Sequence, residues 1–222
     1  MEKLRNILVF LGPPGSGKGS LSSYFTQHKN CFQLSTGNLC RKYASSKTRL
    51  GKEIDFLLKS GKLIPDDLIL DMVKEELEVV SEESLILDGF PRTENQAKIL
   101  HDFLKQRDFN FNIIKFEISE DLVIRRLSNR LVCTSKDCQA VYSTLKDSSF
   151  QANKENRCAK CTSILEKRSD DKLSVVKKRL QDYLQTEKDI LNFYSTVGQP
   201  IVNLDASKPF SGLFEEVKKL IK

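Results

Sequence analysis

The chain has 222 residues, of which 39% are hydrophobic and 30% are charged, and its formal net charge is +6. These values are typical of a globular protein and exclude a disordered chain. The apolar run near the N-terminus is too short to span a bilayer or to serve as a standard signal segment, so we expect no membrane association and a reducing, cytoplasmic location. The basic residues are scattered rather than clustered, which favours anionic ligands only weakly.

A glycine-rich loop between a strand and a helix is the most informative stretch. Residues 6–11 are an apolar run typical of a buried parallel strand. They lead into the phosphate-loop pattern Gly-x-x-x-x-Gly-Lys at residues 12–18, with Gly19 inserted before the hydroxyl of Ser20. Backbone N–H groups in such a loop face an anion, and the dipole of the following helix adds to the attraction. The loop therefore predicts a nucleotide phosphate site rather than a plain turn.

The second strand is predicted over residues 31–34. Thr36 or Asn38 could cap the helix that follows, which carries Arg41. Arg41 could equally be a surface charge. Further along, Asp66 is a candidate cap at the start of another helix.

A third strand over residues 84–88 ends in the carboxylate of Asp88. Because ligands of a parallel sheet bind at the carboxyl ends of its strands, Asp88 is placed to hold Mg²⁺ beside the phosphate loop, unless it only caps a turn. The tight turn after it brings Arg92 into the same crevice. Thr93 and Gln96 fit a capping box, which gives Gln96 a structural role beside a ligand one.

A fourth strand over residues 113–118 leads to a predicted helix over residues 120–131, with Ser119 as its cap. Arg126 and Arg130 would share one face of this helix. Two cations so placed repel each other unless an anion lies between them. The pair therefore indicates either an anion site or a solvated basic face.

Two cysteine pairs come next, Cys133 with Cys138 and Cys158 with Cys161. Their spacing predicts a four-thiolate zinc site rather than four unligated thiols. The polar segment between the pairs cannot bury enough apolar surface to hold itself together, and a structural zinc would supply the missing stability. A catalytic zinc is not expected, because four protein ligands leave no open position.

Strands and helices alternate along the whole sequence. A long amphipathic helix carrying Arg179 is predicted over residues 173–194, then a fifth strand over residues 199–205 and a closing helix. This order predicts an α/β fold with a five-stranded parallel sheet, helices on both of its faces, and an inserted zinc-bearing lobe.

Four blocks of residues resemble the adenylate kinase family: residues 12–20, 35–37, 88–93 (Asp-Gly-Phe-Pro-Arg-Thr) and 168–171 (Arg-Ser-Asp-Asp). They follow the family's order and spacing over nearly the whole chain, and the cysteine segment is similar to the zinc-bearing lid of the long bacterial-type enzymes. The resemblance implies a P-loop kinase fold and the reaction MgATP + AMP ⇌ 2 ADP, performed by a monomer. It also implies one domain, 1–222, made of a core (1–34, 65–128 and 172–222), a monophosphate-binding segment (35–64) and a zinc-binding lid (129–171).

The resemblance also implies a role for each matching residue. The donor ATP would be held by Gly15, Ser16, Gly17, Lys18, Gly19, Ser20, Arg130, Val141, Tyr142 and Lys208. The acceptor AMP would be held by Thr36, Arg41, Lys62, Leu63, Ile64, Gly89, Phe90, Pro91, Arg92, Gln96, Arg168 and Arg179. The charge of the transferred group would be stabilised by Mg²⁺ near Asp88 and by Lys18, Arg92, Arg130, Arg168 and Arg179. No general base is needed, because the acceptor is already an anionic phosphate oxygen.

Three positions depart from the family pattern. Asn38 stands in place of Asp, Leu131 in place of the second of two adjacent arginines, and the first cysteine pair is spaced more widely. The alternatives are a pyrimidine monophosphate kinase of the same fold, GTP as donor, nucleotide binding without turnover, and nucleic-acid binding by the cysteine lobe. Thr36 and the long lid favour AMP, and the few aromatic residues of the lobe argue against nucleic acid.

Overall fold

A computed structural model describes residues 6–28, 31–46, 48–80, 84–135 and 138–220. Its centre is a five-stranded sheet in the order β2-β3-β1-β4-β8, and each neighbouring pair of strands is parallel. The prediction of a five-stranded parallel sheet is therefore confirmed. The strands are β1 (Asn6–Leu11), β2 (Cys31–Ser35), β3 (Ser84–Asp88), β4 (Phe111–Glu117) and β8 (Ile201–Asp205).

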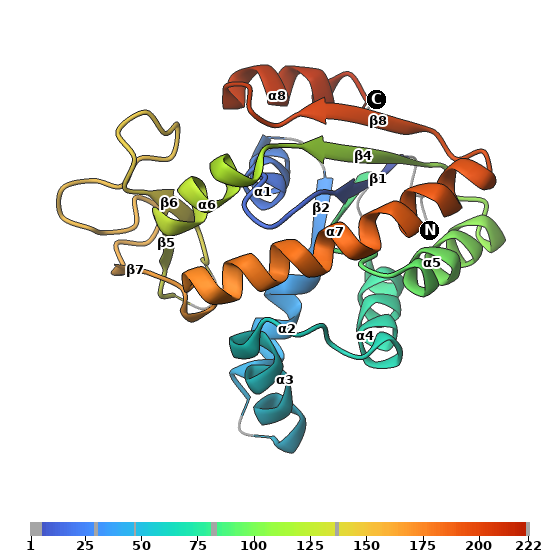
Figure 1. Ribbon diagram of the computed structural model, residues 1–222, viewed down its shortest axis with the longest axis horizontal. Coiled ribbons are helices and arrows are strands. Elements are labelled where there is room, and N and C mark those ends of the chain that lie inside the picture. The colour runs from blue at the N-terminus through green and yellow to red at the C-terminus, as the bar shows by residue number, and fades with distance from the viewer. Residues whose placement is uncertain (1–5, 29–30, 47, 81–83, 136–137, 221–222) are drawn as a thin grey trace.

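Helices cover both faces of this sheet, as Figure 1 shows. Side chains alternate along β1, so that Ile7 and Val9 pack on one face and Leu8 and Phe10 on the other. Burial on both faces explains why these strands are almost continuously apolar. The first face is covered by α4 (Asp66–Val79), α5 (Glu94–Gln106) and α7 (Leu173–Thr196), and the second by α1 (Lys18–His28) and α8 (Phe210–Lys218).

Two segments project from this layered core, at the bottom and the left of Figure 1. One consists of α2 (Thr36–Ala44) and α3 (Arg49–Ser60). The other is a three-stranded antiparallel sheet of β5 (Arg130–Cys133), β6 (Val141–Ser143) and β7 (Leu165–Glu166), which leads through the short 3₁₀ helix η1 (Ser169–Asp171) to α7. Its small apolar cluster of Leu131, Cys133, Cys158 and Leu165 is separate from the core clusters.

The helix caps were predicted with mixed success. Thr93 caps α5, and Ser119 caps α6 (Glu120–Ser128), as expected. The prediction of Thr36 or Asn38 as the cap of α2 was wrong, because the Ser35 hydroxyl accepts the capping bond from the Asn38 N–H. Asp66 is the first residue of α4 rather than its cap, and its carboxylate accepts hydrogen bonds from the side chains of Thr93, Asn95 and Gln96.

The helix predicted over residues 120–131 is shorter than expected. Helix α6 (Glu120–Ser128) ends two residues before Arg130, which begins strand β5. Residues 130–133 pair with β6 and β7, so ladder hydrogen bonds replace the helical ones. Arg126 and Arg130 therefore do not share a helix face, and that prediction was wrong. Within the described ranges, no helix combines the length and the apolar character that crossing a bilayer requires.

Candidate active site

A cavity of about 740 Å³ lies at the carboxyl ends of the central strands, where a parallel sheet is expected to bind its ligand. The core, the α2–α3 segment and the lobe of β5, β6 and β7 all contribute to its walls. Among the predicted site residues, the following line it: Gly15, Ser16, Gly17, Lys18, Gly19, Ser20, Arg41, Lys62, Leu63, Asp88, Gly89, Pro91, Arg92, Arg130, Val141, Tyr142, Arg168, Arg179 and Lys208.

The phosphate loop follows β1 and wraps around Lys18. The ammonium group donates hydrogen bonds to the carbonyl oxygens of Gly12 (2.6 Å) and Pro13 (2.9 Å) and to the Ser16 hydroxyl (3.1 Å). Burial lowers the pKa of Lys18 to about 8, against the opposing effect of Asp88. At Gly15 the backbone has a φ of +80°, and an added Cβ would come within 2.8 Å of Leu127, so only glycine fits here.

Asp88 lies directly against this loop at the end of β3. An added Cβ on Gly19 would come within 3.2 Å of the Asp88 Oδ2 atom, and the amide of Gln33 donates to the same oxygen at 3.4 Å. Carboxylate oxygen is the ligand type that Mg²⁺ prefers. The position beside the phosphate loop thus fits a magnesium ion bound together with a nucleotide.

Arginines from the lobe and from α7 face the phosphate loop across the cavity. Arg130 makes a two-pronged ion pair with Asp171, and Arg179 pairs with Asp170 at 3.3 Å. Burial, together with the positive charges of Arg130 and Arg41, lowers the pKa of Arg168 well below its usual value. Burial also lowers the pKa of Arg179 to about 10. Asp170 and Asp171 offset only part of the positive charge that these arginines bring to the cavity, so the cavity is suited to polyphosphate.

Four of the residues predicted to hold a nucleotide, Thr36, Ile64, Phe90 and Gln96, do not line the cavity; all four are buried. The Thr36 hydroxyl donates to the carbonyl oxygen of Gly89 at 2.8 Å. The Gln96 side chain accepts from the Arg92 backbone N–H at 2.7 Å and donates to Asp66 at 2.6 Å. These contacts support the structural role for Gln96, which holds the turn that carries Arg92.

The sequence did not predict every residue at the cavity. Arg126 lines it and donates to the carbonyl oxygens of Ser16 (3.4 Å) and Ala206 (2.9 Å), so it ties the phosphate loop to the turn after β8. The sequence pointed to Arg126 only through its spacing of four residues from Arg130. That spacing was interpreted as a shared helix face, whereas Arg130 lies on strand β5. Lys208 borders the same wall, with its ammonium group paired to Glu216 at 2.7 Å.

The lobe reaches the core through an aromatic contact. The ring of Phe150, from the loop after β6, meets the ring of Phe210 at the start of α8 edge to face, with 4.7 Å between centroids. Val141 and Tyr142 on β6 face the cavity from the same lobe. The lobe therefore forms part of the cavity wall and contacts the core at the start of α8.

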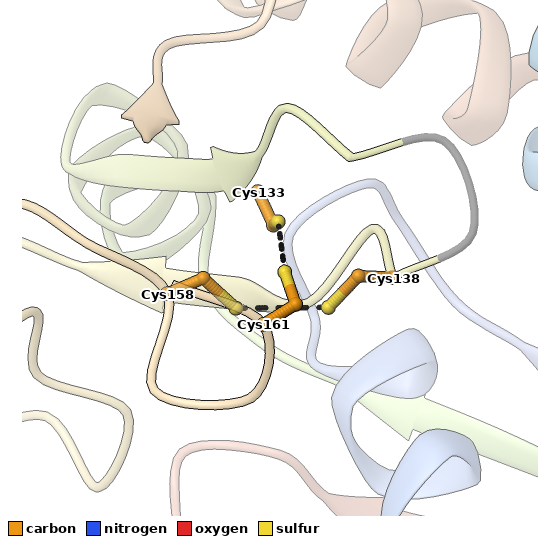
Figure 2. Close-up of side chains that lie close together, drawn as sticks. All are labelled: Cys133, Cys138, Cys158 and Cys161. Carbon is orange, nitrogen blue, oxygen red and sulfur yellow. Dashed lines mark hydrogen bonds between the residues drawn. The ribbon is translucent and has the colours of Figure 1, made fainter. Parts of the chain in front are cut away.

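The four predicted zinc ligands come together in this lobe. Figure 2 shows their sulfur atoms turned toward a common centre, and all four lie within 4.8 Å of one another. Cys133 and Cys161 are 3.2 Å apart, and Cys138 and Cys158 are 3.6 Å apart. Tetrahedral zinc with bonds of about 2.3 Å separates its sulfur ligands by about 3.8 Å, so the cluster fits this ion. The wider spacing of the first pair does not prevent the cluster from forming.

Comparison with known proteins gives a consistent family. The family described as "Adenylate kinase" matches residues 10–199. An adenylate kinase of Chlamydia trachomatis is 36% identical over 98% of this chain and 90% of its own length. Adenylate kinases of Borrelia turicatae and Borrelia garinii subsp. bavariensis are 36% and 38% identical over 96% of this chain, and the matches cover 98% and 95% of their lengths.

Proposed function

This chain belongs to the adenylate kinase family of nucleoside monophosphate kinases, and we infer that it transfers the terminal phosphoryl group of MgATP reversibly to AMP, giving two ADP. One observation carries this inference: the phosphate loop, Asp88 and arginines from three parts of the chain all line the same cavity. Nucleotide binding without turnover would need neither the carboxylate nor the facing arginines.

On the donor side, the phosphates of ATP lie on the backbone N–H groups of residues 15–20 and on Lys18. Lys18 donates to the carbonyl oxygens of Gly12 and Pro13 at the floor of the loop, which holds its ammonium group where the phosphates of ATP would lie. Asp88 would hold Mg²⁺, directly or through water, and the ion would supply positive charge against the bound phosphates. Arg130, Val141 and Tyr142 close over the donor from the lid, and Lys208 lies at the adenine side.

On the acceptor side, Arg41 and Arg92 bind the phosphate of AMP. Lys62, Leu63 and Gly89 border its nucleoside, while Thr36 and Gln96 support the site from behind. Arg168 and Arg179 lie between the two nucleotides and stabilise the charge spread over the transferred group. The acceptor oxygen is already anionic, so no residue is required as a general base.

We propose three functional parts within a single domain, 1–222. The core is 1–34, 65–128 and 172–222, the monophosphate-binding segment is 35–64, and the lid is 129–171. Closing the lid excludes water, which would otherwise hydrolyse ATP. We further propose that Cys133, Cys138, Cys158 and Cys161 hold a structural zinc ion in the lid, and that the protein is a cytoplasmic monomer, since unoxidised thiolates persist in a reducing compartment.

The decisive experiment measures ADP formation by purified protein with MgATP and each of AMP, CMP, UMP and GMP. We expect strong turnover with AMP alone. Turnover with CMP or UMP would keep the mechanism but change the acceptor, and no turnover with any of them would leave only a binding role. Replacing ATP by GTP in the same assay identifies the preferred donor.

The lowered pKa of Lys18 gives an expected pH dependence. The lysine must be protonated to attract phosphate, and in the free protein it loses its proton as the pH rises through about 8. The ratio kcat/KM for ATP reports the free enzyme, so it should fall above this pH, whereas kcat should stay flatter because bound phosphates raise the pKa of the lysine. A ratio that stays constant to about two pH units above this pKa would separate Lys18 from donor binding.

A further inference from the structure

One side-chain contact joins the lid directly to helix α2 across the cavity. The Nε–H group of Arg41 donates to the Oε1 atom of Gln139 at 3.4 Å, although the two residues are 98 positions apart. Gln139 lies between Cys138 and strand β6, and both partners line the nucleotide cavity. The proposed acceptor site is therefore in contact with a residue of the lid.

The backbone of Gln139 is in a conformation that glycine would adopt more easily. Its φ is +44°, in the left-handed region. For a residue with a Cβ this conformation costs about 1–2 kcal/mol. Such costs concentrate where a particular side chain has a function. A glycine would adopt this backbone conformation without cost but has no side-chain amide. The function of Gln139 is therefore expected to depend on its amide.

The contacts of Arg41 show what the amide does. Its Nε atom donates to Gln139, and its Nη2 atom donates to the Oδ1 atom of Asn38. Both acceptors are neutral, and the carboxylate of Asp170 is already paired with Arg179 at 3.3 Å. Burial lowers the pKa of Arg41, but an arginine stays charged at neutral pH.

The remaining edge of the guanidinium group is the one formed by its two terminal nitrogens. On one edge of the group, Nε donates to the amide of Gln139 and Nη2 donates to the amide of Asn38. Across the described residues, the third nitrogen, Nη1, has no hydrogen-bond partner. Arginine binds a phosphate group with two parallel N–H bonds, and the terminal edge offers such a pair. The amides fix the direction of the guanidinium group without neutralising it.

We propose that Gln139 is a positioning residue of the acceptor site, which reaches from the lid to hold Arg41 with its terminal edge toward the phosphate of AMP. This inference rests on the proposed function, because it requires Arg41 to bind that phosphate. It follows that the acceptor site is complete only when the lid is closed. Loss of the Gln139 amide therefore weakens AMP binding more than ATP binding.

The test compares two variants of Gln139 in steady-state kinetics. Gln139→Met keeps the length of the side chain and the backbone cost but has no amide oxygen. KM for AMP should rise about 3- to 10-fold, in line with the net contribution of one ordinary hydrogen bond, while kcat and KM for ATP stay within about two-fold. Gln139→Gly should raise KM for AMP equally and should keep or raise the melting temperature, because glycine relieves the left-handed backbone.

A merely structural role predicts a different result. Gln139→Gly would then lower the melting temperature and change both KM values together. Zinc content is measured beside the kinetics, since Gln139 follows Cys138, and the KM comparison is made on preparations with equal content. Gln139→Glu, which gives Arg41 a charged partner that competes with phosphate, should raise KM for AMP at least as much as Gln139→Met.

The proposed function and this inference fail in different ways. A wild-type protein that does not phosphorylate AMP removes the proposed function. A wild-type protein that does so, with Met and Gly variants whose KM for AMP stays within about two-fold of its value, overturns the role of Gln139 and leaves the proposed function standing.

Discussion

Replacing Lys18 by Met is expected to lower turnover by about 10³-fold while the fold persists. The lysine is the only charged side chain inside the phosphate loop, and it is held there by Gly12, Pro13 and Ser16. A methionine of similar length fills the same space but cannot neutralise the charge that develops on the phosphates. Turnover with MgATP and AMP measures the effect.

The stability of this variant separates the chemistry from the fold. Burial lowers the pKa of Lys18 to about 8, so the folded state binds this proton less tightly than the unfolded state. The charged lysine therefore opposes folding at neutral pH, and the opposition disappears as the pH rises from the folded toward the unfolded pKa. Lys18→Met should not lower the melting temperature at pH 7.

The exposed lysine of the pair Lys98–Glu94 provides the control, because Lys98→Met should leave turnover unchanged. Near-normal turnover of Lys18→Met would exclude the phosphate loop from catalysis.

Replacing Cys158 by Ser, or removing metal with a strong chelator under reducing conditions, is expected to lower the melting temperature by about 10 °C. The lid has only a small apolar cluster, in which Cys158 is buried together with Leu131 and Leu165. Such a cluster contributes far less than a zinc ion, which supplies on the order of 10 kcal/mol in small zinc modules. In a chain of this size, each kcal/mol of lost stability lowers the melting temperature by about 2–4 °C. A loss of a few kcal/mol therefore accounts for the expected shift.

Turnover should fall as well, because Arg130, Val141 and Tyr142 lie on the strands that the cysteines hold together. Cys40→Ala is the matched control: this cysteine is on α2, outside the cluster, so zinc content should remain at the wild-type value. Elemental analysis and a melting curve decide the matter. If the purified protein contains no zinc and the chelator does not change its melting curve, the proposed zinc site is contradicted.

The sequence was most informative where the signal is local. The apolar strands, the phosphate loop, Asp88 at the end of β3 and the caps at Thr93 and Ser119 depend on neighbouring residues, and the structure contains them as predicted. The spacing of the cysteines likewise carried enough information to predict the cluster.

The predictions failed where distant segments decide the outcome. Residues 130–133 continue a helical pattern, and only their pairing with β6 and β7, which follow later in the chain, makes them a strand. The segment 35–38 offers several side chains that can cap a helix, and the choice of Ser35 depends on how β2 ends. Nothing local indicates that Gln139 meets Arg41, because that contact depends on how the lid sits over the core.

The order of the strands has a consequence for the synthesis of this protein. Strand β1 lies in the middle of the sheet and precedes every other described strand in the chain, but its neighbours β3 and β4 end only at Asp88 and Glu117. On the ribosome, the apolar strand that leads into the phosphate loop is therefore made long before either neighbour exists. Pairing over so long a stretch of chain is slow, and an unpaired apolar strand is prone to aggregate. The phosphate loop is thus encoded early, but the strands that flank β1 and the rest of the cavity wall, Lys208 included, are added only later.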